Sequence, residues 1–150
     1  MRAALLLTLL IAGCTAPTLT QLRPALLDQG DFFGTLAREE RRHAIFLGRH
    51  GAAIREAERF AQKAEAARTG RLPDPEPAED AAMAATRVRL MAALATPAKD
   101  KCPVFAALAV ARYDAWAERQ RAWPNGEEAR GFRRDTEENL AALEGPCRAG

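Results

Sequence analysis

The chain contains no serine among its 150 residues. A serine nucleophile, as found in many hydrolases, is therefore excluded. Aromatic residues make up 6% of the sequence and β-branched residues are sparse, whereas alanine is abundant. Because alanine favours helices, and because apolar residues recur at three- and four-residue spacing, the sequence predicts an all-α fold.

Neither sign of charge predominates. Lysine and arginine number 22 and aspartate and glutamate 20, for a net charge of +2. The two signs alternate in stretches such as 38–42 (REERR) and 55–59 (REAER), which is typical of solvated helix faces with ion pairs three and four residues apart. Nucleic-acid binding would call for a one-sided basic stripe, so we expect no nucleic-acid partner.

Signals of catalysis or metal binding are also few. There is no glycine-rich phosphate loop. His43 and His50 are seven residues apart with Glu39 one turn before His43, but they lack the i, i+4 spacing of a strong metal motif, so we interpret them as solvated or capping residues. Glu127 and Glu128 are better explained as first-turn residues favoured by the helix dipole than as an acid and base pair. We therefore expect no catalytic residues, no metal and no cofactor.

The longest apolar run is too short to span a membrane. Arg2 precedes about ten mostly apolar residues, 3–12, whereas a spanning helix needs roughly twenty. A positive start followed by a short apolar run is typical of a signal peptide, which is removed. The sequence predicts that residues 1–13 form this cleaved segment.

Ile11-Ala12-Gly13-Cys14 closes the apolar run. These residues resemble the lipobox of bacterial lipoproteins. The resemblance implies that the Cys14 thiol is alkylated with diacylglycerol and that the new amino terminus is acylated, for example with palmitate. Two or three acyl chains anchor a protein nearly irreversibly, since each buried CH₂ contributes about 0.8 kcal/mol. The alternative is an ordinary secretory signal that happens to end in a cysteine.

The mature chain divides into a tether and one domain. We expect residues 14–30 to hold the lipidated cysteine and a polar, proline-containing link, and residues 31–150 to form the helical domain. The nine residues of 15–23 reach on the order of 30 Å when extended, at ~3.3 Å per residue. Without Arg2 the net charge is near +1. Thr15 resembles the residue after the cysteine in lipoproteins released to the outer membrane, so we expect an anchor facing the periplasm there, with the inner membrane as an open alternative.

Helix signals divide the domain. Asp31 is the expected N-cap of a first helix. A second helix is expected over 52–69 and should end at Gly70. Gly51 either caps the first helix or forms a kink in one continuous helix, so the sequence leaves open whether this region holds one helix or two. Prolines at 73, 75 and 77 predict an extended loop over 72–79. Further helices are expected over 78–95, 102–122 and from a capping box of Asn125 and Glu128 onwards. We expect the third to turn inward Ala81, Ala84, Ala85, Val88, Met91, Ala92 and Ala95.

Two cysteines remain beside Cys14. An even pair in an exported protein indicates a disulfide, Cys102–Cys147. Two long helices joined by the short turn at Trp123-Pro124 should pack antiparallel and bring both cysteines to the open end. The fold expected is thus a bundle of four to five helices ending in a disulfide-stapled antiparallel hairpin. The rival interpretation is a pair of unpaired or intermolecular thiols.

A longer resemblance follows the helices. Residues 56–64 (EAERFAQKA), 87–94 (RVRLMAAL) and 113–120 (YDAWAERQ) resemble the helical region that precedes the peptidoglycan-binding domain in OmpA-family lipoproteins of alphaproteobacteria. The likeness spans about 33–143. The family's motif cysteines correspond to Ala115 and Ala129, so Cys102–Cys147 would replace that disulfide. No OmpA-type domain follows, so the resemblance does not imply peptidoglycan binding.

Aromatic residues gather in the expected hairpin. Alanine-rich domains need a few large residues to bury enough area, so we interpret this group as core; a groove for a peptide or ligand is the alternative. Asp114 and Arg119 are hypothesised to orient it through a half-buried pair. The group comprises Phe105, Tyr113, Trp116, Trp123 and Phe132.

These observations favour a non-enzymatic lipoprotein of the cell envelope. Its domain would be a structural or protein-interaction module, its partners the membrane and another envelope protein. A periplasmic module that binds a small apolar ligand or inhibits an enzyme through the aromatic hairpin is the alternative. An enzyme is the third possibility, and it would need a cleft with a cluster of strongly perturbed titratable residues.

Overall fold

The computed structural model describes residues 30–49 and 53–149, and these residues form helices and no strands. The expectation of an all-α fold is confirmed. Residues 1–29, with the expected signal, Cys14 and tether, lie outside the described residues, as do His50 and Gly51. None of the described helices is both long enough and apolar enough to cross a membrane. The helices are α1 (Phe32–Arg49), α2 (Ile54–Arg68), α3 (Ala81–Leu94), α4 (Ala98–Lys101), α5 (Pro103–Ala122), α6 (Glu127–Glu144) and α7 (Pro146–Ala149).

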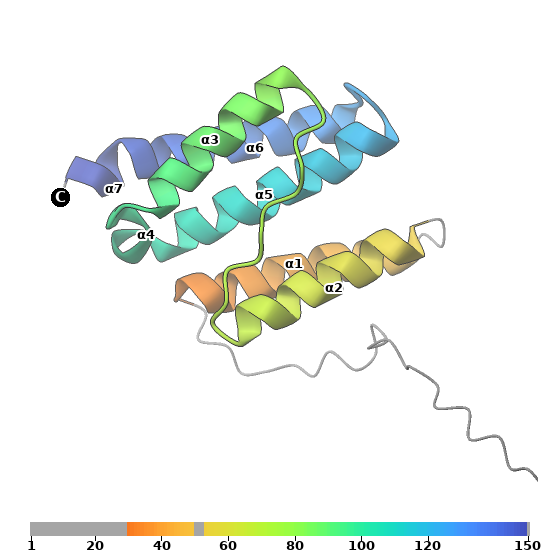
Figure 1. Cartoon of the computed structure of the whole chain (residues 1–150), viewed down its shortest axis with the longest axis horizontal. Helices are drawn as coiled ribbons and strands as arrows, with labels where there is room; N and C mark the ends of the chain where they lie inside the picture. The colour runs from red at the N-terminus through yellow and green to blue at the C-terminus, as the bar shows by residue number, and fades with distance from the viewer. Residues whose placement is uncertain (1–29, 50–52, 150) are drawn as a thin grey trace, which may run out of the picture.

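Helix α5 lies between two layers of helices (Figure 1). α1 and α2 lie side by side on one side of it, and α3 and α6 lie on the other. α2 packs mainly on α1, and α1 packs on α5. Because α5 is covered from both sides, it is buried over most of its length and shows no polar stripe. The largest fully buried side chains of the described residues include Leu36, Phe60, Met83, Leu90, Tyr113 and Leu140.

Local signals set most of the helix ends. Asp31 caps α1 as predicted, its side chain accepting a hydrogen bond from the Gly34 N–H. The capping box at Asn125 is wrong: α6 begins after Gly126, and Asn125 has a φ of 58°. The Asn125 N–H donates to Gln120 Oε1 at 3.1 Å, and Glu128 pairs with an arginine of α5 instead.

The predicted inward face of α3 is wrong. The seven residues expected inside are all exposed, Val88 to 71%. The buried residues of α3 are instead Met83, Thr86, Leu90, Ala93 and Leu94. Alanine occurs all round this helix, so the spacing of its apolar residues did not identify the side that packs. The exposed residues of α3 and its C-cap include Ala81, Ala84, Ala85, Val88, Met91, Ala92 and Ala95.

An extended segment joins the two layers. Residues 71–78 are not helical, as the alternating prolines predict, and the chain crosses α5 on its way from α2 to α3 (Figure 1). We call residues 71–80 the proline strap. At its end Asp80 caps α3, its carboxylate accepting from the Met83 N–H at 2.8 Å.

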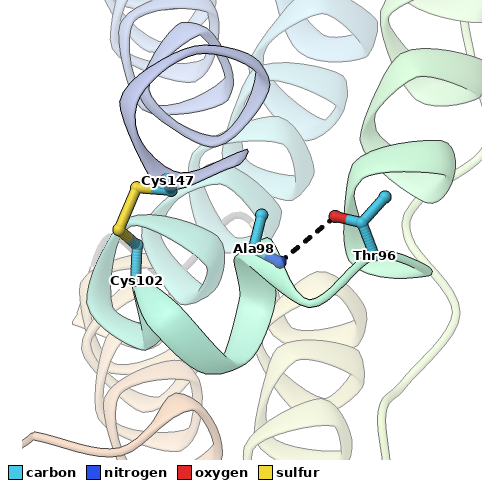
Figure 2. The surroundings of a disulfide bond; sticks show 4 residues. All are labelled: Thr96, Ala98, Cys102 and Cys147. Atoms are coloured by element: carbon cyan, nitrogen blue, oxygen red, sulfur yellow. Dashed lines mark hydrogen bonds between the residues drawn. A yellow bond between two sulfur atoms is a disulfide. The ribbon is translucent and has the colours of Figure 1, made fainter. Parts of the chain in front are cut away.

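The predicted disulfide is present. Cys102 and Cys147 are bonded, with their Cα atoms 5.9 Å apart, and Figure 2 shows the bond joining the start of α5 to α7. The short helices α4 and α7 on either side of it were not predicted. Before α4, the Ala98 N–H donates to Thr96 Oγ1 at 3.2 Å (Figure 2).

Two glycines allow a matched test of backbone conformation. Gly70 ends α2 with a φ of +76°, whereas Gly131 lies within α6, and a Cβ at either meets nothing within 4 Å. Gly70→Ala should therefore lower the free energy of unfolding by about 1 kcal/mol through conformation alone. Gly131→Ala should raise it by about 0.5–1 kcal/mol, because alanine favours a helix interior. Urea unfolding followed by circular dichroism measures both, and equal effects would contradict the left-handed cap.

Candidate functional site

The aromatic residues of α5 and its following turn divide into two groups. Tyr113 and Trp116 are buried, with ring centroids 6.1 Å apart in an edge contact, so the core interpretation is confirmed for them. Trp123 is 68% exposed and Phe105 is 47% exposed, so for these two it is wrong. Trp123 is the C-cap of α5, directly after the last residue of that helix.

Trp123 lies at the edge of a hollow of about 770 Å³, which we call the Trp123 hollow. It is formed by the ends of α1 and α5 and the starts of α2 and α6. Alanines, a leucine and two aromatic rings supply much of its wall. The side chains around it include Phe46, Leu47, Ala53, Glu118, Arg119, Ala122, Trp123, Glu128 and Ala129.

Three of the charged residues that line the Trp123 hollow form ion pairs with one another. Arg119 Nε lies 2.6 Å from Glu118 Oε2, and Arg119 Nη1 lies 3.2 Å from Glu128 Oε2. The Arg119 guanidinium also lies 5.4 Å from the centre of the Phe46 ring, at cation–π distance. Burial raises the pKa of Glu118, but His43 and Arg119 outweigh it, so the pKa is lowered overall. The hollow thus combines apolar walls with fixed polar groups.

A second hollow of about 410 Å³ adjoins the first and shares Phe46 and Glu128 with it. His43 lies there with its Nε2 3.5 Å from Glu118 Oε2. Its ring packs against that of Phe60, with the two ring centroids 4.5 Å apart. Glu39, one turn before His43, pairs instead with Arg112 at 3.1 Å. In the described part of the chain, no three His, Cys, Asp or Glu side chains are placed to hold a metal ion.

The interpretation of residues 38–42 as a solvated face is wrong for two of them. Glu39 and Glu40 are buried, Glu40 to 1% exposure. Its carboxyl lies among charged groups of three other segments, which we call the buried carboxyl cluster. The cluster comprises Glu40 of α1, Lys63 of α2, Glu76 of the proline strap and Asp114 of α5.

Asp114 is the centre of this cluster and is fully buried. Its Oδ2 accepts from Lys63 Nζ at 2.6 Å, and its Oδ1 accepts from the backbone N–H of Glu76 at 2.6 Å. The hypothesised pair with Arg119 is therefore wrong. Five residues along a helix are about 140° round its axis, so Arg119 faces the Trp123 hollow instead.

Burial and the neighbouring charges shift the pKa values of the cluster. Burial raises the pKa of Asp114 despite the opposing effect of Lys63. It raises the pKa of Glu40 well above the usual range, and the charge of Asp114 adds to this. It would lower the pKa of Lys63, but Asp114 and Glu40 outweigh it and the pKa is raised. Lys63 is thus held as an ammonium ion among carboxyl groups.

A sequence signal for this cluster existed. Glu40 lies at helical spacing between Leu36 and Ala44, in the middle of the buried stripe of α1. Lys63 lies three residues after Phe60 on the buried stripe of α2. Charged residues at inward positions of two neighbouring helices indicate a buried pair or cluster.

Comparison of the chain with models of protein families, with curated proteins and with solved structures found no match.

Proposed function

We propose that the protein is a non-enzymatic lipoprotein of the bacterial cell envelope. Lipid on Cys14 anchors it to the periplasmic face of the outer membrane, and its helical domain acts as a structural or protein-interaction module. The lipobox resemblance of residues 11–14 supports the anchor. The disulfide Cys102–Cys147 supports an oxidising compartment, since such bonds persist in the periplasm and are rare in the cytosol. The likeness of residues 33–143 to OmpA-family lipoproteins supports the envelope location.

The observation that carries the interaction role is the exposure of Trp123 beside its hollow. Tryptophan and arginine are enriched among residues that dominate protein interfaces, and Arg119 lines the same hollow. α5 and α6 pack against each other, and the disulfide Cys102–Cys147 joins the start of α5 to α7, which supports a stable framework for this surface. Trp123 lies at the end of α5 opposite the disulfide, about 30 Å along the helix from Cys102. We infer that the partner is an envelope protein that inserts an apolar side chain here.

Photocrosslinking in the living bacterium tests this role. A photoreactive amino acid at Trp123 should yield one discrete crosslinked species in the membrane fraction. The same amino acid at Arg134, an exposed residue of α6 that does not line either hollow, should yield none. Loss of the Trp123 species when Cys14 is also replaced would tie the contact to the anchor. Equal crosslinking from both positions would contradict an interface at the hollow.

The Trp123 hollow also supports a second candidate, binding of a small apolar ligand. Ligand pockets usually measure about 300–1,000 Å³ and combine apolar walls with a few fixed polar groups, as this hollow does. The closed packing around Trp116 argues against a ligand there. In this candidate the protein is a periplasmic ligand-binding or enzyme-inhibitor module.

Titration with the apolar dye 1-anilinonaphthalene-8-sulfonate separates the two candidates. If the hollow binds small apolar ligands, Trp123→Ala should weaken dye binding by about tenfold, the loss of ~1.4 kcal/mol. The free energy of unfolding should change by less than about 0.5 kcal/mol, because Trp123 is exposed. Phe105→Ala, which removes another exposed aromatic side chain that does not line the hollow, is the control. Equal dye binding by wild type and both variants would leave the protein-interaction role and exclude the ligand-binding one.

A further inference from the structure

The contact between the α1–α2 pair and α5 contains the buried carboxyl cluster. α2 packs mainly on α1, so the pair is held to the remaining helices through α1 and through the proline strap. Lys63 reaches from α2 to Asp114 of α5 and also donates to the backbone carbonyl of Asp74 in the strap at 2.7 Å. Four segments of the chain therefore meet at one set of charges.

The hydrogen bonds of Lys63 leave none for Glu40. An ammonium group has three N–H donors, and those of Lys63 lie beside Asp114 Oδ2, the Asp74 carbonyl and Glu76 Oε1, the last at 3.2 Å. Both carboxyl oxygens of Glu40 are buried and accept no hydrogen bond from the described residues. An ionised Glu40 would be a buried carboxylate without a donor, which is strongly unfavourable.

The other charges nearby act on Glu76 rather than on Glu40. Arg59 Nε lies 3.1 Å from Glu76 Oε1, and Arg121 Nη2 lies 3.4 Å from Glu76 Oε2. The groups that face Glu40 are thus Lys63 from α2, Glu76 from the strap and Asp114 from α5. Ionisation of Glu40 would put a third carboxylate beside the single ammonium of Lys63.

We propose that Glu40 is a proton-binding site: it carries a proton in the folded protein at neutral pH, and loss of that proton undocks the α1–α2 pair from α5. The buried carboxyl cluster then acts as a latch that a rise in pH opens. The protonated carboxyl of Glu40 donates to Asp114, which leaves Lys63 to pair with Asp114 and Glu76. This latch is independent of the lipid anchor and of the Trp123 hollow.

The direction of the pH effect follows from the proton count. Burial and the charge of Asp114 raise the pKa of Glu40 in the folded protein, and hydrogen bonding to Asp114 raises it further. At pH values between the pKa of an unfolded glutamate, about 4.3, and the raised pKa of Glu40 in the folded protein, the docked state binds one more proton than the undocked state. Docking is therefore favoured at low pH and weakens as pH rises through this window, by at most tenfold in the docking equilibrium per pH unit for one proton.

Amide hydrogen exchange of Glu40→Gln tests the latch. Glutamine keeps the shape of a protonated carboxyl and cannot ionise. In the wild type, protection of α1 and α2 relative to α6, corrected for intrinsic exchange rates, should fall several-fold from pH 6 to pH 9. In Glu40→Gln it should stay constant. Glu138→Gln, the same change at an exposed position of α6, should behave as the wild type.

A direct titration guards against a variant that fails to fold. In wild-type protein with ¹³C-labelled glutamate carboxyls, the Glu40 signal should report a protonated acid at pH 7, whereas exposed glutamates report carboxylates. The proposal is overturned if Glu40 is ionised at pH 7. It is also overturned if Glu40→Gln and the wild type lose protection of α1 and α2 equally as pH rises.

Discussion

Asp114→Ala is expected to lower the free energy of unfolding by about 3–5 kcal/mol, the usual cost of removing one partner of a buried ion pair. The change leaves the ammonium of Lys63, which is 8% exposed, without its 2.6 Å partner. It also removes the acceptor of the Glu76 N–H, which is one of the hydrogen bonds between the proline strap and α5. Urea unfolding followed by circular dichroism measures the loss.

Two comparisons show whether the loss comes from the buried pair. Asp100→Ala removes an exposed carboxylate of α4 and should change the free energy of unfolding by less than about 0.5 kcal/mol. Lys63→Met combined with Asp114→Leu removes both charges and should recover much of the stability that Asp114→Ala loses. If Asp114→Ala costs no more than Asp100→Ala, Asp114 does not hold the layers together.

Removing the disulfide should have the second large effect. Cys102 and Cys147 are separated by 45 residues, and closing a loop of that length stabilises a protein by about 4 kcal/mol in the chain-entropy treatment. Cys102→Ala combined with Cys147→Ala should therefore lose about this amount, because both substitutions together leave no free thiol. The urea midpoint measures it.

Reduction of the wild type provides the matching control. Dithiothreitol should lower the wild-type midpoint to near that of the double variant and leave the double variant unchanged. A wild-type midpoint that does not move on reduction would show that the bond does not stabilise the folded chain. The loss of stability on reduction should be concentrated at the end of the bundle where α4, α5 and α7 meet (Figure 2).

Features governed by neighbouring residues were predictable from the sequence. Pro103 stands at the first turn of α5, where its missing N–H costs nothing, and the helix begins there. Alternating prolines excluded a helix from the strap. Gly70 has the left-handed conformation expected of a helix end. The pairing of the two cysteines was also predictable, because the two helices between them determine where the cysteines lie.

Features that depend on which surfaces meet were not predictable in the same way. The alanines of α3 gave no preferred face, so the choice of the Leu90 side depends on the helices that it meets. The exposure of Trp123, at the C-cap of α5, likewise depends on which helices surround that end. Glu40 looked like a member of a solvated charge run, and Lys63 was not singled out, although each occupies an inward helical position. A charge at an inward position was the available sign of the buried carboxyl cluster.

The mass of the mature chain, isolated from the cells that make it, tests the central claim of a lipid-anchored envelope protein most directly. The account predicts that wild-type protein lacks residues 1–13, carries the mass of diacylglycerol and an acyl chain on Cys14, and is found with the membranes. Cys14→Ser should carry no lipid. A wild-type chain without lipid, differing in mass from Cys14→Ser by no more than the substitution and equally free in the periplasm, would contradict it.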